Sequence, residues 1–275
     1  SGTGSGLYEI TPELEVVNRY IFRRWGKMLR PALVYFSARA ANGLGSEQTR
    51  LSDELGSDDI ERLRALGLTT EYVQVDPAHP TGTVEVRLDA SGNPDFTITE
   101  NVAWDYLAWT PLWGQLADKA DAVCFGSLAQ RSVESEQTIM CFLQAASPDT
   151  LRIFDINLRQ SFYSAVAIAE SLRQADVLKL NTEELPQLAN LLEFEETEPV
   201  TLCRKLIALY GVDLVCITRG PQGCLMVNEA EVIDQPGIEV EVADTVGSGD
   251  AFTAAMAHHL LKGSYLQRTA EAANR

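Results

Sequence analysis

The apolar positions of the chain form short runs that alternate with amphipathic stretches from about residue 121 onward. Runs of strand length are expected to form buried strands at Asp121–Ser127, Leu151–Asn157, Ala175–Asn181 and Val212–Thr218. Stretches with helical spacing separate or follow them, at Val133–Ala145, Phe162–Arg173, Glu183–Leu192 and Thr201–Tyr210. Strands that alternate with helices pair in parallel through right-handed crossovers. The pattern therefore predicts an α/β fold with a doubly wound, mostly parallel sheet flanked by helices.

Two further patterns lie outside this alternation. Toward the C-terminus the sequence predicts a hairpin from Gly223–Asn228 and Glu231–Asp234, a strand at Ile238–Val242 and an apolar helix at Ala251–Leu261. Residues 72–100 instead alternate apolar with polar positions around a turn at Asp89–Asn93, which is typical of a half-exposed antiparallel hairpin. We expect a small β flap or lid at about residues 70–105. Its apolar face would be exposed in a monomer, which predicts a homodimer that forms through the flap.

The first fifty residues lack the strand–helix alternation. Leu14–Ala41 is expected to be helical throughout, and the strand with which an α/β domain usually begins is missing from the pattern. We therefore separate an atypical helical segment at residues 1–52 from an α/β domain at residues 53–275.

Composition and charge indicate which kinds of molecule the protein is expected to bind. Of the 275 residues, 45% are hydrophobic and 22% are charged, which is ordinary for a globular protein. The formal net charge of −17 repels phosphate backbones and anionic lipid, so we expect neither nucleic acid nor a membrane as a partner. The five cysteines form no C-x-x-C pair. We interpret them as reduced core residues of a cytoplasmic protein, with neither disulfides nor zinc.

The segment Asp244–Asp250 carries the strongest chemical signal. Glycines at 247 and 249 let the backbone turn sharply, and the helix that follows adds its N-terminal partial positive charge, so the turn forms an anion pocket. A carboxylate beside a phosphate-sized pocket suits phosphoryl transfer, with Asp250 as the base for an attacking hydroxyl. The alternative interpretation is a glycine turn in which Asp250 only caps the helix.

This segment resembles the D-T-x-G-A-G-D signature of the ribokinase-like (PfkB) family of carbohydrate kinases, with Ser248 in place of the usual alanine. Other segments resemble motifs of this family in the same order: Asp155–Arg159 resembles D-x-N-x-R, Asn181–Glu184 resembles N-x-x-E, and Thr218–Gly223 resembles T-x-G-x-x-G. His79–Val84 and Phe96–Asp105 are similar to the fructokinase branch. The resemblance covers roughly residues 53–275, and ordered motifs are stronger evidence than any one motif.

The resemblance implies a ribokinase-like fold, ATP and Mg²⁺ as cofactors, and a set of site residues. The implied catalytic residues are the base Asp250 and an anion hole formed by Gly247, Ser248 and Gly249. The implied substrate- or phosphate-binding residues are Thr81, Asn157, Arg159, Asp244 and Thr245. The implied nucleotide-binding residues are Asn181, Thr218, Gly220, Gly223 and Asn274. Glu184 would hold Mg²⁺ through water, as suits an ion that loses water reluctantly.

Plainer interpretations stay open for these residues. Asn181 and Glu184 would also suit a helix cap and a surface glutamate. Arg159 would suit a surface salt bridge, and Gly220 with Gly223 an ordinary hairpin turn.

The N-terminal region departs from the family pattern. A first strand with a sugar-binding aspartate, and a Gly-Gly signature after it, are not found there. Instead, residues 14–51 resemble the N-terminal helices of isoprenyl diphosphate synthases. Their D-D-x-x-D metal motif is absent, because Asp58-Asp59 is followed by Ile60-Glu61-Arg62, so prenyl transfer by this fragment is a remote alternative.

These observations favour ATP-dependent phosphorylation of a sugar hydroxyl, of the fructokinase type. The alternatives are a nucleoside or 2-keto-3-deoxygluconate kinase of the same family, and a catalytically weak sugar-binding relative.

Overall fold

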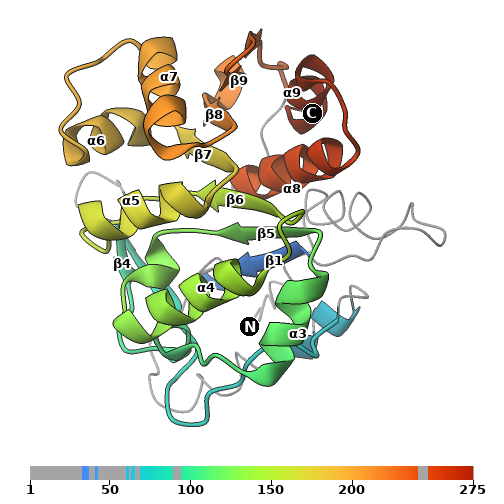
Figure 1. The fold of residues 1–275 in the computed structure, drawn as a ribbon. Coiled ribbons are helices and arrows are strands. Elements are labelled where there is room, and N and C mark those ends of the chain that lie inside the picture. The colour runs from blue at the N-terminus through green and yellow to red at the C-terminus, as the bar shows by residue number, and fades with distance from the viewer. Residues whose placement is uncertain are drawn as a thin grey trace.

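The computed structural model describes residues 33–36, 41–42, 60–61, 63–65, 69–88, 94–240 and 247–274. Its main element is a seven-stranded sheet in the order β1-β5-β6-β7-β8-β9-β10 (Figure 1). The strands are β1 (Leu33–Phe36), β5 (Ala122–Phe125), β6 (Leu151–Asp155), β7 (Val177–Asn181), β8 (Leu214–Thr218), β9 (Cys224–Asn228) and β10 (Val232–Gln235). Pairing is parallel from β1 to β8 and antiparallel from β8 to β10.

Helices cover both faces of this sheet. They are α3 (Pro111–Lys119), α4 (Val133–Ala145), α5 (Ala165–Gln174), α6 (Glu184–Leu191), α7 (Pro199–Tyr210), α8 (Ser248–Leu261) and α9 (Leu266–Ala273). Short 3-10 turns lie at η1 (Ala103–Tyr106), η2 (Leu128–Gln130) and η3 (Gly220–Gln222). Over the described ranges, no helix is both long and apolar enough to cross a membrane.

Local chemistry sets several helix ends. The side chains of Thr110, Ser132 and Ser164 each accept the backbone N–H of the third residue of the helix that follows, α3, α4 and α5 respectively. The cap at Ser164 explains why α5 begins at Ala165, later than the predicted start at Phe162. Gly211 ends α7 in the left-handed conformation that glycine adopts most readily.

Two hydrophobic cores lie on opposite faces of the sheet. Along β6, Phe154 belongs to the core that α3 to α7 cover, whereas Ile153 belongs to the core that α8 and α9 cover. Side chains of a strand alternate between faces, so Asp155 faces the same side as Ile153, toward α8. The predicted α/β class, with a mostly parallel sheet between helices, is confirmed. Because the described strands cross the sheet in chain order, the second helical layer comes from the C-terminal α8 and α9.

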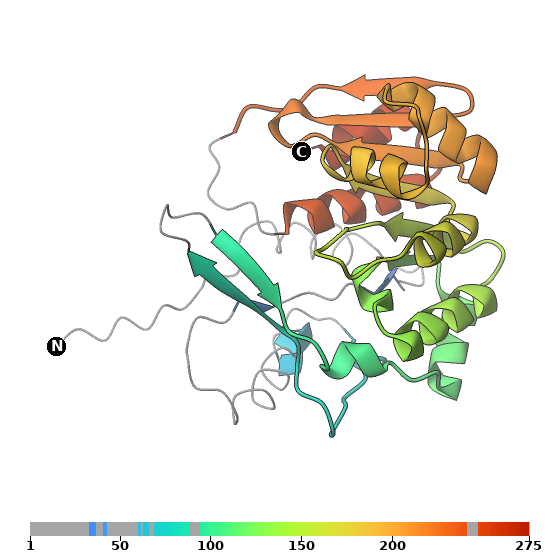
Figure 2. The same cartoon turned by 90° about the vertical axis from the view of Figure 1, so that its left-hand side faces the viewer.

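The predicted flap is also confirmed. It contains β2 (Ala41–Asn42), β3 (Thr83–Leu88) and β4 (Pro94–Ile98), with β3 and β4 antiparallel (Figure 2). Val73 and Val75, which the alternation places in the same hairpin, precede its strands and are exposed.

Two predictions of secondary structure are wrong. Leu33–Phe36 is a strand that pairs in parallel with β5, not part of a helix that extends over 14–41. Its four consecutive apolar residues are β-branched, aromatic or leucine, and such a run suits a buried parallel strand. A short apolar run also occurs in buried helices, so the sequence pattern alone does not distinguish the two. The strand predicted to be missing from the first fifty residues is therefore present. Residues 238–240 of the predicted strand at 238–242 have no regular structure, and Ile238 and Val240 are exposed; residues 241–242 lie outside the described residues.

Candidate active site at the carboxyl ends of the parallel strands

Helix α8 begins with a glycine turn. Gly247 caps the helix at a φ of 82°, in the left-handed region that favours glycine. Its carbonyl accepts a hydrogen bond from the N–H of Ala251 at 2.9 Å, so the helix starts directly after this turn. Ser248, Gly249 and Asp250 form the first turn, whose N–H groups have no acceptor within the helix. The predicted helix start at Ala251 is therefore too late, and Asp250 shares one helix end with the donors of the predicted anion hole.

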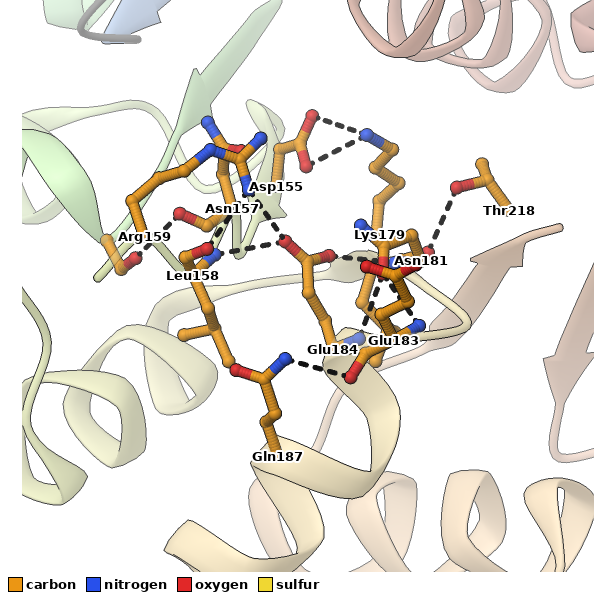
Figure 3. A network of polar contacts seen from close by, with 12 residues as sticks. Asp155, Asn157, Leu158, Arg159, Lys179, Asn181, Glu183, Glu184, Gln187 and Thr218 are labelled. Carbon is orange, nitrogen blue, oxygen red and sulfur yellow. Dashed lines mark hydrogen bonds and ion pairs between the residues drawn. The ribbon is translucent and has the colours of Figure 1, made fainter. Parts of the chain in front are cut away.

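Glu184 joins the ends of two neighbouring strands. Its Oε1 accepts the backbone N–H of Leu158 at 3.0 Å, beyond the end of β6, and its Oε2 accepts the N–H of Asn181 at 2.8 Å, at the end of β7 (Figure 3). The residue is 4% exposed. Burial raises the pKa of Glu184, and the hydrogen bond from Asn181 opposes that rise. The interpretation of Glu184 as a surface glutamate is therefore wrong.

Asn181 and Arg159 flank this carboxylate. The side-chain Oδ1 of Asn181 accepts the N–H groups of Glu183 at 2.8 Å and of Glu184 at 2.9 Å, so it caps the start of α6. Its amide group is left as the donor for a ligand oxygen. The Nη1 of Arg159 lies 3.8 Å from Oε1 of Glu184, and the arginine side chain is 48% exposed. An exposed guanidinium beside a buried carboxylate is oriented yet still able to bind an anion.

A buried ion pair lies behind the start of α8. The Nζ of Lys179 on β7 lies 3.0 Å and 2.9 Å from the two carboxylate oxygens of Asp155 on β6. Thr253 of α8 completes the cluster, with its hydroxyl 3.2 Å from Oδ2 of Asp155. The sequence prediction did not include Lys179 or Thr253, and it gave Asp155 no role. A lysine within an otherwise apolar strand signals a buried partner, because a buried lysine is almost always paired, but this signal does not identify the partner or the role of the pair.

Three of the predicted nucleotide-binding residues, Gly220, Gly223 and Asn274, belong to segments that pack near the end of β10. Gly223 has a φ of 91°, and a Cβ there would lie 2.0 Å from the carbonyl oxygen of Gln235. A Cβ on Gly237 would lie 1.8 Å from the carbonyl oxygen of Pro221, so two backbone segments are in direct contact. Asn274 donates from its side chain to the carbonyl of Pro236 at 2.8 Å. The loop that holds Gly220 and Gly223 is thus packed against residues 235–237, beyond what an ordinary hairpin turn requires.

The remaining predicted residues are distributed as follows. Thr218 ends β8 beside Asn181 of β7, and its hydroxyl donates to the carbonyl of Leu180 at 3.3 Å. Asn157 adopts a left-handed φ of 48° just after β6. Thr81 lies at the base of the flap, two residues before the start of β3. Asp244 and Thr245 lie outside the described residues.

The fit of a magnesium ion depends on the carboxylate of Glu184. No cluster of three or more histidine, cysteine or acidic residues that could hold a metal occurs within the ranges given above. Each oxygen of Glu184 already accepts one backbone N–H and has one lone pair left. A carboxylate engaged in this way suits contact with Mg²⁺ through water, and this ion usually keeps several waters.

Sequence relatives are sugar kinases. The chain is 29% identical over 211 residues to the sugar kinase PH1459 of Pyrococcus horikoshii, a match that covers 77% of this chain and 65% of that protein. It is 32% identical over 196 residues to a fructokinase of Vibrio alginolyticus, with 68% and 60% covered. The chain therefore spans less than two thirds of the length of these relatives. The resemblance of residues 14–51 to isoprenyl diphosphate synthases finds no support here.

Solved structures share the fold. The crystal structure of PH1459 in complex with ATP has a TM-score of 0.69 at 24% identity, with 96% of this chain and 79% of that chain covered. A candidate ribokinase II of Escherichia coli, in complex with ATP and Mg²⁺, has a TM-score of 0.72 at 19% identity, with 95% and 78% covered. A nucleoside kinase of Methanocaldococcus jannaschii has a TM-score of 0.63 at 19% identity, with 81% and 68% covered.

The carbohydrate kinase family described as pfkB matches residues 37–275, which is most of the chain. The match begins inside the segment 1–52 that the sequence pattern sets apart, and it includes the glycine turn of α8, the strand ends and the flap. The chain therefore belongs to the pfkB family of carbohydrate kinases.

Proposed function

We propose that the protein transfers the terminal phosphoryl group of ATP to a hydroxyl of a sugar. The observation that carries this proposal is the position of Asp250 in the first turn of α8, directly after the left-handed Gly247. A general base and a set of backbone N–H donors thereby share one helix end, as transfer of an anionic group to a hydroxyl requires.

In the proposed reaction Asp250 accepts the proton of the attacking sugar hydroxyl. The hydroxyl oxygen forms a bond to the γ-phosphorus as the bond from that phosphorus to the bridging oxygen of ADP breaks. The N–H groups of the first turn of α8 stabilise the negative charge on the transferred group, and Arg159, just after β6, is proposed to bind the same anion. ADP leaves with the bridging oxygen, and the carboxyl of Asp250 returns its proton to solvent.

Asn181 and the loop after Thr218 are proposed to hold the nucleotide. The free amide of Asn181 would donate to a phosphate oxygen, while Glu184 keeps the strand ends together and contacts Mg²⁺ through water. When bound, Mg²⁺ neutralises charge on the phosphates. The ATP complexes of PH1459 and of the ribokinase II candidate support ATP as the nucleotide.

The finer proposal is that the sugar is fructose. The fructokinase of Vibrio alginolyticus supports it at 32% identity, as do the flap segments that resemble the fructokinase branch. The nucleoside kinase of Methanocaldococcus jannaschii supports the alternative substrate class at the level of the fold. A site that binds a given hydroxyl rejects analogues that lack it strongly, so one substrate should dominate a comparison.

A coupled assay of ADP release, with ATP and Mg²⁺, tests this function on fructose, ribose, adenosine and 2-keto-3-deoxygluconate. We expect fructose to give the highest kcat/KM. Preference for another member of the panel would keep the kinase and reject the fructokinase assignment. Absence of turnover with every member, by protein that binds ATP, would favour a sugar-binding relative.

A homodimer through the flap is a second part of this proposal. Within the described strands, β4 pairs with β3 on one edge and has no strand on the other. An edge strand of this kind is a template for pairing with another chain. Sedimentation at micromolar concentrations should give a dimer, and a monomer at every concentration would contradict it. The cytoplasmic location stays a prediction.

A further inference from the structure

We propose that Lys179, Asp155 and Thr253 form a buried positioning unit that holds the first turn of α8, and Asp250 with it, in register with the strand ends. This inference rests on the proposed role of Asp250. The unit joins β7, β6 and α8, and its residues act through the backbone of the helix rather than by contact with substrate.

The ion pair between Asp155 and Lys179 connects the two strands of the unit. Asp155 and Lys179 are directly opposite each other in the parallel register of β6 and β7, and both carboxylate oxygens accept from the ammonium. The two residues are 7% and 8% exposed. Removal of two charges from water is costly, and apolar replacements of such pairs are often neutral or stabilising. Stability alone therefore does not account for a charged pair at this place, whereas a fixed arrangement of neighbouring groups does.

Thr253 connects the pair to the helix. Its hydroxyl lies 2.9 Å from the carbonyl oxygen of Gly249 and 3.2 Å from Oδ2 of Asp155, so its single hydrogen is shared between the two acceptors. The residue is completely buried. One hydroxyl thus joins the first turn of α8 to the carboxylate on β6.

Gly249 provides a second contact between the pair and the helix. A Cβ at this position would lie 3.2 Å from Nζ of Lys179, which is tighter than an ordinary contact. Because glycine has no side chain, the ammonium packs directly against the backbone of the turn that precedes Asp250. The glycine of the signature therefore has a packing reason on the sheet side, in addition to any role toward an anion.

The charges around the unit are consistent with this arrangement. Burial raises the pKa of Asp155, Lys179 opposes that rise, and the charge of Asp250 adds to it. The ammonium of Lys179 therefore stabilises the ionised form of Asp155 against both burial and the nearby charge of Asp250. Without it, Asp155 would be an unpaired buried anion near Asp250.

Paired threonine variants provide the first test. Thr253→Val removes the shared hydroxyl and keeps the shape of the side chain. Thr269→Val is the matched control, because Thr269 is also fully buried and donates to the carbonyl four residues earlier, Tyr265, in α9. We expect kcat at saturating ATP and sugar to fall about tenfold in Thr253→Val, with KM for ATP within about twofold. The control should keep its kcat. Equal kcat in the two variants would overturn the proposal.

Charge variants provide the second test. Lys179→Met leaves the Asp155 carboxylate buried and unpaired, whereas Lys179→Met with Asp155→Asn removes both charges. We expect the double variant to be more stable than the single one, because the unpaired charge is gone. Its kcat should nevertheless stay at least about tenfold below that of the natural sequence, because the contact with Gly249 is lost. Recovery of full kcat together with stability would assign the pair a structural role only.

A third readout does not depend on turnover. Amide hydrogen exchange in the peptide that spans the first turn of α8 should be faster in Thr253→Val than in Thr269→Val. Equal exchange would overturn the positioning role even if Asp250 is the base. Conversely, if Asp250→Asn keeps full turnover, the proposed role of Asp250 as the base fails, while the exchange comparison still decides the positioning role.

Discussion

The carboxylate of Glu184 accepts a hydrogen bond from the backbone N–H of Leu158, a residue 26 positions earlier, at 3.0 Å. Its second oxygen accepts the N–H of Asn181. The two bonds hold the segment after β6 against the start of α6, so the strand ends that carry Arg159 and Asn181 keep a fixed separation. Glu184, for which the family motif implies a role toward a metal, thus also acts as a backbone clamp, because it holds these two segments together.

Glu184→Gln tests the clamp. A glutamine has one acceptor oxygen and one NH₂ group, so one of the two backbone N–H groups would face a donor and stay unsatisfied. We expect the free energy of unfolding to fall by about 1–3 kcal/mol in a denaturant titration. The adjacent, exposed Glu183→Gln is the control and should change it by less than about 0.5 kcal/mol. Equal stability of the two variants would contradict the clamp.

Asp250→Asn tests the proposed base. The amide is close in size to the carboxylate but cannot accept the proton, so kcat should fall by about 10²–10⁴. Thermal unfolding should change little, because the amide keeps the size of the carboxylate and a single charge at a helix start contributes little to stability. Glu134→Gln, in the first turn of α4, is a matched control for that loss of charge and should keep its kcat. Full turnover by Asp250→Asn would exclude Asp250 as the base.

Two glycine variants test the packing of the nucleotide-side loop. Gly223→Ala meets both a positive φ and the carbonyl of Gln235, whereas Gly211→Ala, at a φ of 75°, has nothing within 4 Å of its Cβ. We expect Gly211→Ala to lose about 1 kcal/mol of stability from backbone strain alone. Gly223→Ala should lose about 1–3 kcal/mol more and raise KM for ATP. Similar losses in both variants would show that the loop yields easily.

The lowered pKa of His258 predicts that the stability of the protein changes with pH. Burial, with the positive charges of Lys262 and His259, lowers the pKa of His258 from 6.5 to about 4. As the pH falls, His258 therefore binds a proton in the unfolded chain before it does so in the folded protein. The contribution of neutral His258 to the free energy of unfolding is complete above pH 6.5 and is lost as the pH falls toward about 4. Thermal melts should show the natural sequence losing Tm relative to His258→Gln across this range. Parallel curves would contradict the shifted pKa.

The sequence predicts the central sheet well because its strands are buried on both faces. The four strands β5 to β8 are near-continuous apolar runs. The amphipathic helices between these runs identify them as strands of a parallel sheet. Leu33–Phe36 has the same character, but its neighbours favour a helix, and only the pairing with β5 identifies it as a strand. Ile238 and Val240 alternate as a strand would, yet the segment packs through the backbone of Gly237 and forms no ladder.

Some residues of the candidate site can likewise be predicted from the sequence and others cannot. Motif residues such as Asp250 and Glu184 are recognisable from spacing, because helix starts and strand ends have sequence signals. Lys179 and Thr253 are not, since their role depends on which face of β7 meets α8. That face is set by the register of the sheet and by a helix far along the chain, neither of which is visible in a local pattern.

The division of the core between two faces has a consequence for folding. Helices α4 to α7 each cover strands that are their neighbours in sequence, whereas α8 must return to β6 from beyond β10. Contacts between near neighbours form faster than contacts that close long loops. We therefore expect the helical layer over the first face to form before α8 docks on the second. Asp250 would reach the strand ends only with that late step, so a chain that already has most of its secondary structure would still lack the proposed base.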